Sequence, residues 1–249
     1  MKTNSSSGGA ACPLAAPRLY ETSALRRATG DTLRPGGLSL LQIALQQTNW
    51  PAGGRVLDVG CGIGTTAVYL RQTHRLQAMG LDLSAQLLGE AAIANPELPL
   101  IRGRAEILPI GDSSLAGLTC ECVLSLVKDP LNTLREFHRV LAKDGQLILS
   151  DIYRRRDIKD KDLPGNCCLA GAHNRDQLLD WLQQAGFSVQ LWQDHSRLLA
   201  ELAARLVWQH GSMEDFWSQF SADGDGRPMQ HAVQAMRPGY CLMIASKKG

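Results

Sequence analysis

The stretch RVLDVGCGIGTTAVYL, residues 55–70, decides the fold. It begins with an apolar run typical of a buried strand, passes through Gly60, Gly62 and Gly64, and continues into a helix-compatible segment. Glycines between a strand and a helix allow a sharp turn and let backbone N–H groups approach a ligand. Asp58 ends the strand and places a carboxylate beside that turn. The stretch therefore predicts a nucleotide-type binding site at the end of the first strand.

Strands and helices alternate on both sides of a second anchor residue, Asp82, which ends the next strand 24 residues after Asp58. An acidic residue at this distance is placed to accept the hydroxyls of a ribose, and it fits either a nicotinamide dinucleotide or a sulfonium nucleoside. A sulfonium group is positively charged, so nearby carboxylates such as Asp58 favour it electrostatically, whereas a dinucleotide phosphate would be repelled.

The remaining pattern predicts an α/β fold. We expect five strands over residues 55–60, 76–83, 99–105, 116–124 and 146–153, separated by helices over 65–71, 85–94 and 130–142. Alternation of this kind implies right-handed crossovers and a parallel sheet covered on both faces. A helix over 174–187, a strand over 187–195, a helix over 196–209 and a last strand over 237–247 follow. The last strand is expected to run antiparallel, which gives a Rossmann-like, seven-stranded, mostly parallel sheet.

The chain is expected to form one domain after a disordered tail. The tail covers residues 1–17 and the domain residues 18–249. Within the domain we expect N-terminal helices over 20–50, a cofactor-binding core over 54–153, and a C-terminal, substrate-side part over 165–249 that includes a helical insertion over 196–220.

Composition narrows the function classes. The 26 basic and 24 acidic residues give a net charge of only +2, which is not the electrostatic footprint of a nucleic-acid binder. No apolar run reaches the length of a membrane span, and the seven cysteines, an odd number, do not suggest a disulfide framework. We expect a cytoplasmic protein with a small-molecule substrate and neither nucleic-acid nor membrane partners.

Four motifs together carry a family resemblance. They are VLDVGCGIG at 56–64, GLDLS at 80–84, RGRAEILPI at 102–110 and EFHRVLAKDGQLILSD at 136–151. In order and spacing they resemble the successive motifs of class I S-adenosylmethionine-dependent methyltransferases. Within that group the chain is similar to the quinone, sterol and arsenite branch, methyltransferase type 11, whose hallmark is a helix ending in His-Arg-Val-Leu, here residues 138–141.

The resemblance implies S-adenosylmethionine as cofactor and a set of residues that bind it. The glycine turn would hold the methionine part, Asp82 the ribose, and Leu83 the adenine. Two departures from the family pattern stand out: Arg104 replaces an acidic residue that contacts the adenine amino group, and residues 143–145 replace a Pro-Gly-Gly turn. The candidate cofactor-binding residues are Tyr20, Asp58, Gly60, Cys61, Gly62, Gly64, Asp82, Leu83, Ala105, Glu106 and Glu121.

Candidate substrate residues follow from the rule that ligands of open parallel sheets bind outside the carboxyl ends of the strands. Three cysteines among them could converge on a thiophilic substrate such as a trivalent metalloid, as in the arsenite methyltransferases, although a buried Cys is commonly just a small apolar residue. The candidates are Cys122, Ser125, Tyr153, Cys167, Cys168, Arg237 and Tyr240.

Methyl transfer is an in-line displacement that needs a base only when the nucleophile begins protonated. The candidate base is His195, because imidazole titrates near neutrality and Asp194 stands beside it. No metal ligands are assigned.

The sequence thus favours a methyltransferase acting on an unidentified small molecule and leaves alternatives open. One is a thiol-coordinated, arsenite-type metalloid methyltransferase. Others, from a different class, are a nucleotide-dependent oxidoreductase and a non-catalytic S-adenosylmethionine-binding protein. For the last, the insertion and the stretch MEDFWSQF at 213–220 are a candidate interaction surface and homodimer contact.

Overall fold

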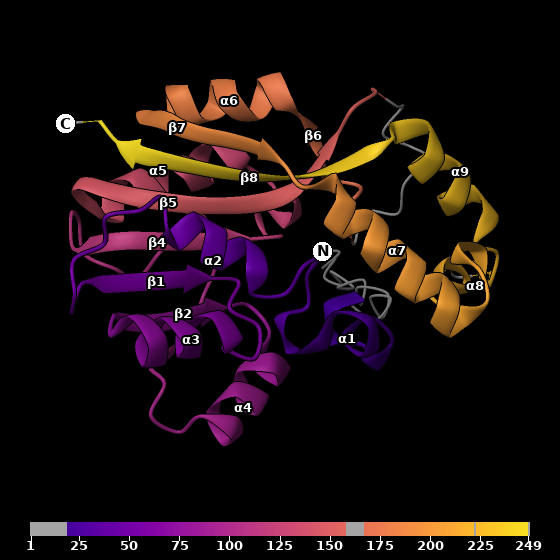
Figure 1. Cartoon of the computed structure of the whole chain (residues 1–249), viewed down its shortest axis with the longest axis horizontal. Coiled ribbons are helices and arrows are strands. Elements are labelled where there is room, and N and C mark those ends of the chain that lie inside the picture. The colour runs from indigo at the N-terminus through magenta and orange to yellow at the C-terminus, as the bar shows by residue number, and fades with distance from the viewer. Residues whose placement is uncertain (1–18, 158–166, 222, 249) are drawn as a thin grey trace, which may run out of the picture.

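A central sheet organises the molecule (Figure 1). The computed structural model describes residues 19–157, 167–221 and 223–248, and the predicted tail lies outside these ranges. Within them the sheet has eight strands, in the order β3-β2-β1-β4-β5-β8-β7, with the short β6 paired to β5. The strands are β1 (Arg55–Val59), β2 (Gln77–Asp82), β3 (Leu100–Arg102), β4 (Leu115–Glu121), β5 (Leu141–Arg154), β6 (His173–Asn174), β7 (Phe187–Asp194) and β8 (Pro238–Lys247).

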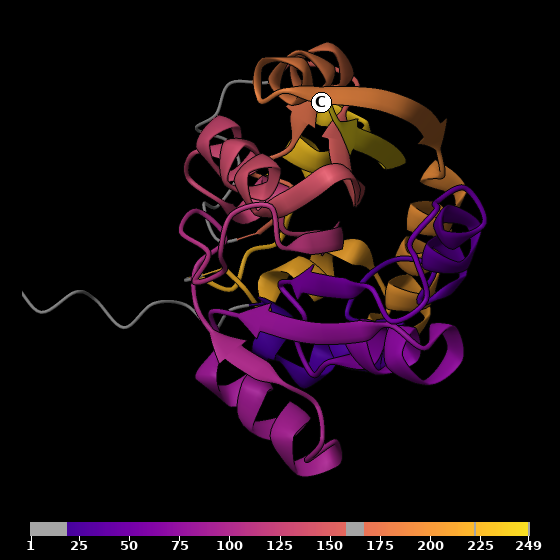
Figure 2. The same cartoon turned by 90° about the vertical axis from the view of Figure 1, so that its left-hand side faces the viewer.

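Helices surround the sheet (Figure 2). The α-helices are α1 (Ser23–Thr29), α2 (Ser39–Leu45), α3 (Thr65–His74), α4 (Ala85–Ala94), α5 (Pro130–Val140), α6 (Arg175–Gln184), α7 (Ser196–His210), α8 (Met213–Ser218) and α9 (Arg227–Met236). Short 3-10 helices are η1 (Leu19–Glu21), η2 (Gly30–Thr32) and η3 (Leu124–Leu126). None of the helices in the described ranges is long and apolar enough to cross a membrane.

The strand directions confirm the predicted fold class. β1 is parallel to β2 and β4, β2 to β3, and β4 to β5, whereas β8 is antiparallel to both β5 and β7. Because two antiparallel steps restore the direction, β7 runs the same way as the parallel strands. The carboxyl ends of β1, β2, β4, β5 and β7 and the start of β8 therefore share one edge of the sheet.

Alternating side chains on the strands build a core on each face. Val56 and Ile244 pack with apolar residues of α2 and α3 on one face, while Leu57 and Met243 pack with α5 and α6 on the other. All four strand residues are at most 1% exposed. This period of two is what a sheet covered on both sides requires, and it fixes the register that brings the strand ends together.

The glycine turn after β1 has the backbone that the sequence predicts. Gly60, Gly62 and Gly64 have φ angles of +72°, +55° and +84°, in the left-handed region that favours glycine. A Cβ atom on Gly60 would lie 2.1 Å from Cγ2 of Val123, so no other residue fits there. The Gly60 and Cys61 amides donate to the Leu81 carbonyl, which ties the turn to β2.

Helices α7, α8 and α9 form a layer beside the carboxyl edge of the sheet, with α1 against α7 (Figure 1). Helix α9 and strand β6 were not predicted from the sequence, and β5 begins five residues earlier than predicted. β6 has only two residues, too few for a periodic pattern, and β5 starts at Leu141 because that residue already pairs with Leu115. For α9 the signal was present: Met229, Ala232 and Met236 recur at helical spacing and are buried.

Candidate functional site

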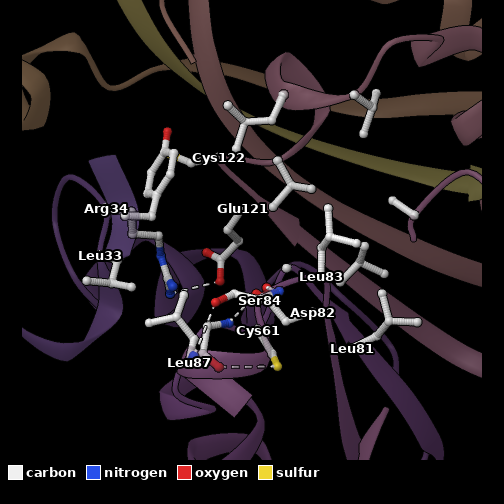
Figure 3. A pocket seen from close by; sticks show the side chains of 18 of the residues that line it. Leu33, Arg34, Cys61, Leu81, Asp82, Leu83, Ser84, Leu87, Glu121 and Cys122 are labelled. Carbon is white, nitrogen blue, oxygen red and sulfur yellow. Dashed lines mark hydrogen bonds and ion pairs between the residues drawn. The ribbon is translucent and has the colours of Figure 1, made fainter. Parts of the chain in front are cut away.

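The main cavity, of about 730 Å³, opens at the carboxyl ends of β1, β2 and β4 (Figure 3). This volume lies within the range of small-molecule sites, roughly 300–1,000 Å³. The glycine turn, the loop after β2 and residues 31–34 of the N-terminal segment line it, together with residues after β4 and around Cys167. The topology thus brings segments far apart in sequence to one edge of the sheet.

Asp82 is held rigidly at the end of β2. Its Oδ2 accepts a hydrogen bond from the Gly62 amide at 2.8 Å, and its Oδ1 accepts one from the Ser84 amide at 2.8 Å. Each carboxylate oxygen has a further lone pair, so the fixed side chain can still accept from two hydroxyl groups. A vicinal diol such as that of a ribose fits this arrangement. Ser84, which caps α4 through the Leu87 amide, also donates to Glu21 of η1.

Asp58 lies almost fully buried below the glycine turn, with 3% of its surface exposed. Its Oδ1 accepts a hydrogen bond from the Thr119 hydroxyl at 2.7 Å, whereas its buried Oδ2 has no hydrogen-bond partner in the protein. Burial, assisted by the negative charge of Glu121, raises the pKa of Asp58 to about 7. An ordinary buried carboxylate would be fully bonded, so the open oxygen indicates a missing donor.

Arg34 and Glu121 form a buried ion pair beside Asp58. Arg34 Nη2 lies 2.8 Å from Glu121 Oε2, and the Thr66 hydroxyl bridges the two side chains. Both side chains are less than a tenth exposed, yet Arg34 Nε and Glu121 Oε1 are buried without partners. Figure 3 shows the pair at the cavity wall. The wall therefore offers two open carboxylate oxygens and one open guanidinium N–H.

The lining is richer in carboxylates than in cations. It contains six acidic side chains and three basic ones, and one of the basic residues, Arg104, pairs with Glu106 at 2.9 Å. Such a surface attracts a ligand that carries positive charge and repels a diphosphate. It suits an amino-acid-like group bearing an ammonium, a carboxylate and a further cation. The charged lining residues are Glu21, Asp31, Arg34, Asp58, Asp82, Arg104, Glu106, Glu121 and Lys128.

The structure brings most of the predicted site residues together in this cavity. Gly64 is not among the lining residues: it caps α3, and its Cα packs near Leu98. Tyr240 and Cys168 lie behind the wall in the buried core. The predicted residues that line the cavity are Tyr20, Asp58, Gly60, Cys61, Gly62, Asp82, Leu83, Ala105, Glu106, Glu121, Cys122, Ser125 and Cys167.

The cysteines that suggested a metalloid substrate are buried and protonated. Cys122 Sγ donates to the Tyr240 hydroxyl at 3.6 Å, and that hydroxyl lies 3.1 Å from Ser150 Oγ. Burial raises the pKa of the thiols of Cys122, Cys167 and Cys168. A soft metalloid is bound by thiolates, so these neutral thiols are better described as part of the apolar wall.

Ser125, beside the cavity after β4, is anchored by a buried carboxylate. Asp151 at β5 accepts hydrogen bonds from the Ser125 amide at 2.8 Å and from its hydroxyl at 2.6 Å. The Ile152 amide also donates to Asp151, at 2.7 Å. Burial raises the pKa of Asp151 to about 6. A serine that lines the cavity is thus linked to a group that titrates near neutrality.

The predicted acid–base pair His195 and Asp194 lies outside the cavity, because neither residue is part of its lining. Asp194 accepts hydrogen bonds from the Tyr153 hydroxyl and from Arg155 Nη2, the latter at 2.7 Å. A ring nitrogen of His195 lies 3.0 Å from Gln193 Oε1, and burial lowers its pKa. Asp194 therefore does not orient the imidazole.

Tyr153 belongs to this separate surface cluster, and Arg237 caps α9 with a φ of +50°. Neither is among the cavity residues. Three residues that line the cavity were not predicted from the sequence: Arg34, Thr66 and Ser84. Ser84 carries a recognisable signal, because a serine directly before an expected helix is a typical N-cap residue. No sequence pattern marks Arg34 as a buried arginine.

Comparison with known proteins finds similarity in the core of the chain. Residues 57–149 match the methyltransferase domain family. Among curated relatives, an uncharacterized methyltransferase of Synechocystis sp. is 33% identical over 126 residues, 49% of this chain and 59% of that protein. A demethylmenaquinone methyltransferase of Staphylococcus epidermidis is 34% identical over 105 residues, 40% of this chain and 44% of that protein. The chain spans roughly half the length of the curated relatives it matches.

Solved structures share the fold at lower identity. The [4+2]-cyclase SpnF superposes with a TM-score of 0.68 at 24% identity, covering 84% of this chain and 79% of that one. The Haemonchus contortus phosphoethanolamine N-methyltransferase 2 in complex with S-adenosyl-L-methionine gives 0.70 at 17% identity, covering 91% and 56%. These likenesses support the Rossmann-like architecture.

Proposed function

We propose, from the match of residues 57–149 to the methyltransferase domain family, that the protein is an S-adenosylmethionine-dependent methyltransferase acting on a small molecule. One observation carries the proposal: Asp58 and Glu121 line the cavity together with Asp82, which is positioned to accept from a diol, and each keeps one buried carboxylate oxygen without a partner. A ligand that joins a ribose to a doubly cationic amino-acid tail satisfies all three.

The cofactor would be held by residues of this chain alone. Asp82 would hold the ribose hydroxyls, Asp58 and Glu121 would hold the ammonium group, and Arg34 would hold the carboxylate. When bound, S-adenosylmethionine supplies a methyl group on a positively charged sulfur for in-line displacement. The carboxylate-rich lining stabilises that cation in the low-dielectric cavity.

The acceptor would enter at the end of the cavity formed by the loop after β4 and by the segment around Cys167. For an acceptor that begins protonated, Ser125 and Asp151 provide a route for the proton. Ser125 lines the cavity, and Asp151 has a pKa raised to about 6, close to the working range of a general base. This pair takes the role that the sequence analysis gave to His195.

The negative charge of the cavity argues against the alternative function, a nucleotide-dependent oxidoreductase. A nicotinamide dinucleotide would bring a diphosphate against Asp58 and Glu121. Fold alone does not decide the chemistry, since a cyclase shares it. The proposal therefore rests on the donors and acceptors of the site.

Calorimetric titration of the whole chain with S-adenosylmethionine and, separately, with NADH tests the proposal. Asp82→Ala removes a charged hydrogen-bond acceptor, so affinity for S-adenosylmethionine should fall about tenfold or more. Asp180→Ala, at an exposed aspartate of α6, is the matched control and should leave affinity unchanged. Binding of NADH in preference, or no binding of S-adenosylmethionine by folded protein, would overturn the proposal.

A further inference from the structure

We propose that the methyl acceptor carries a neutral, apolar group about the size of one ring, which binds in a second cavity between the sheet edge and helices α7–α9. The inference rests on the proposed function, because the neighbouring cofactor cavity defines where the reacting methyl group lies. It adds the chemical class of the acceptor and the segment of the chain that selects it.

The second cavity, of about 130 Å³, adjoins the first. Four residues line both cavities: Tyr20, Leu33, Cys122 and Cys167. Its far wall comes from the helical layer, with Leu199, Leu202, Ala203 and Leu206 on α7, Met213, Phe216 and Trp217 on α8, and Val233 on α9. The cavity thus extends the cofactor site away from the glycine turn and toward helices outside the matched family core.

The absence of charged side chains among the described residues of this wall favours an uncharged ligand. The described residues that line the second cavity include no aspartate, glutamate, lysine, arginine or histidine. Burying a charge without a partner is strongly unfavourable, so a charged group would stay in the first cavity. Its polar side-chain atoms are uncharged and include the Tyr20 hydroxyl and the Cys122 thiol near the shared wall and the Trp217 indole N–H on α8.

The volume sets the size of the group. An engineered apolar cavity of about 150 Å³ in another protein stays dry and binds benzene, and the second cavity here is slightly smaller, at about 130 Å³. Protein cores are otherwise close-packed, with few voids larger than a water molecule. A void of this size beside a ligand site is therefore suited to one aromatic or alicyclic ring.

The shared wall places the reacting atom. Cys122 directly follows β4 with a φ of +57°, a left-handed conformation that is uncommon for a residue other than glycine, and its thiol donates a hydrogen bond to the Tyr240 hydroxyl. With its ring in the second cavity, an acceptor presents its nucleophilic atom between Tyr20 and Cys122, facing the first cavity.

Fluorine NMR on the full chain tests the inference with a matched pair of probes. Fluorobenzene is neutral, and 4-fluorobenzoate adds one charge to the same ring. Ala203→Trp fills the cavity from α7, and Val233→Phe fills it from α9. Ala204→Trp, at the adjacent exposed position of α7, is the control for a tryptophan on that helix.

We expect fluorobenzene to bind the native chain and Ala204→Trp, and to bind both filled variants about tenfold or more weakly, the equivalent of 1.4 kcal/mol. It should bind equally well with S-adenosylmethionine present, and 4-fluorobenzoate should not compete. Absence of fluorobenzene binding, equal binding of both probes, or displacement by S-adenosylmethionine would overturn the inference. Failure of S-adenosylmethionine to bind, with fluorobenzene still bound, would instead overturn the proposed function.

Discussion

Replacing Asp58 by asparagine should stabilise the ligand-free protein while weakening its affinity for S-adenosylmethionine. The pKa of Asp58 is raised from its ordinary 3.8 to about 7, first by burial and then by the charge of Glu121. Since a raised carboxyl pKa means that the folded state holds its proton more tightly, folding becomes less favourable as pH rises from 4 to 7. Asparagine carries no charge at any pH and avoids this loss.

The size of the effect follows from the shift. The advantage of Asp58→Asn in free energy of unfolding should grow by about 3 kcal/mol between pH 5 and pH 8, because each pKa unit corresponds to about 1.4 kcal/mol. Arg34 and Asp82 also act on Asp58, but neither is altered by the substitution. Urea unfolding of both proteins across this range measures the difference. An advantage that does not change with pH would refute the reasoning.

Binding should show the opposite trend. A cationic ligand binds the ionised form of Asp58, so affinity of the native chain for S-adenosylmethionine should rise about tenfold between pH 6 and pH 8. In Asp58→Asn the affinity should be lower and nearly independent of pH over this range. Calorimetry in two buffers of different ionisation enthalpy should also detect proton release on binding to the native chain only.

Three further substitutions test the site. Arg34→Met should lower the free energy of unfolding by about 3 kcal/mol, because it leaves Glu121 buried and unpaired, and adding Glu121→Gln should restore much of it. Gly60→Ala should abolish S-adenosylmethionine binding, since its Cβ would meet Val123 at 2.1 Å. Gly89→Ala, in open space on α4, should instead stabilise the chain by about 0.5–1 kcal/mol in the same unfolding assay. Ser125→Ala should reduce turnover of a protonated acceptor about 100-fold without changing S-adenosylmethionine affinity, measured by single-turnover kinetics beside calorimetry.

The fold could be predicted from sequence because its signals are local. The helix expected over residues 85–94 is α4, Asp82 ends β2 as expected, and Asp58 lies one residue before the end of β1. The apolar runs, the glycine turn and the spacing of 24 residues between Asp58 and Asp82 can each be recognised within a few tens of residues. The antiparallel direction of the last strand, β8, was also expected.

The site was only partly predictable, because its electrostatics depend on long-range packing. Arg34 meets Glu121 across 87 positions of the chain, and no periodic pattern reports such a pairing. Asp194 and His195 are adjacent in sequence, but Asp194 ends β7 and contacts Tyr153 and Arg155, whereas His195 is the N-cap residue of α7. Adjacency in sequence is therefore poor evidence for a catalytic pair.

The open polar atoms of the first cavity and the apolar second cavity have one physical explanation. A folded chain without a ligand gains nothing from leaving Asp58 Oδ2, Glu121 Oε1 and Arg34 Nε buried and unbonded. All three lie on cavity-lining residues from β1, β4 and the N-terminal segment, whereas the described residues that line the second cavity include no charged side chain. One part of the wall is thus built for a charged ligand and the other for a neutral one. Because the matched core ends at residue 149 and the three helices follow it, the proposed cofactor site and the proposed acceptor site draw on different parts of the chain. Changes to the helices should alter the acceptor and leave the cofactor bound.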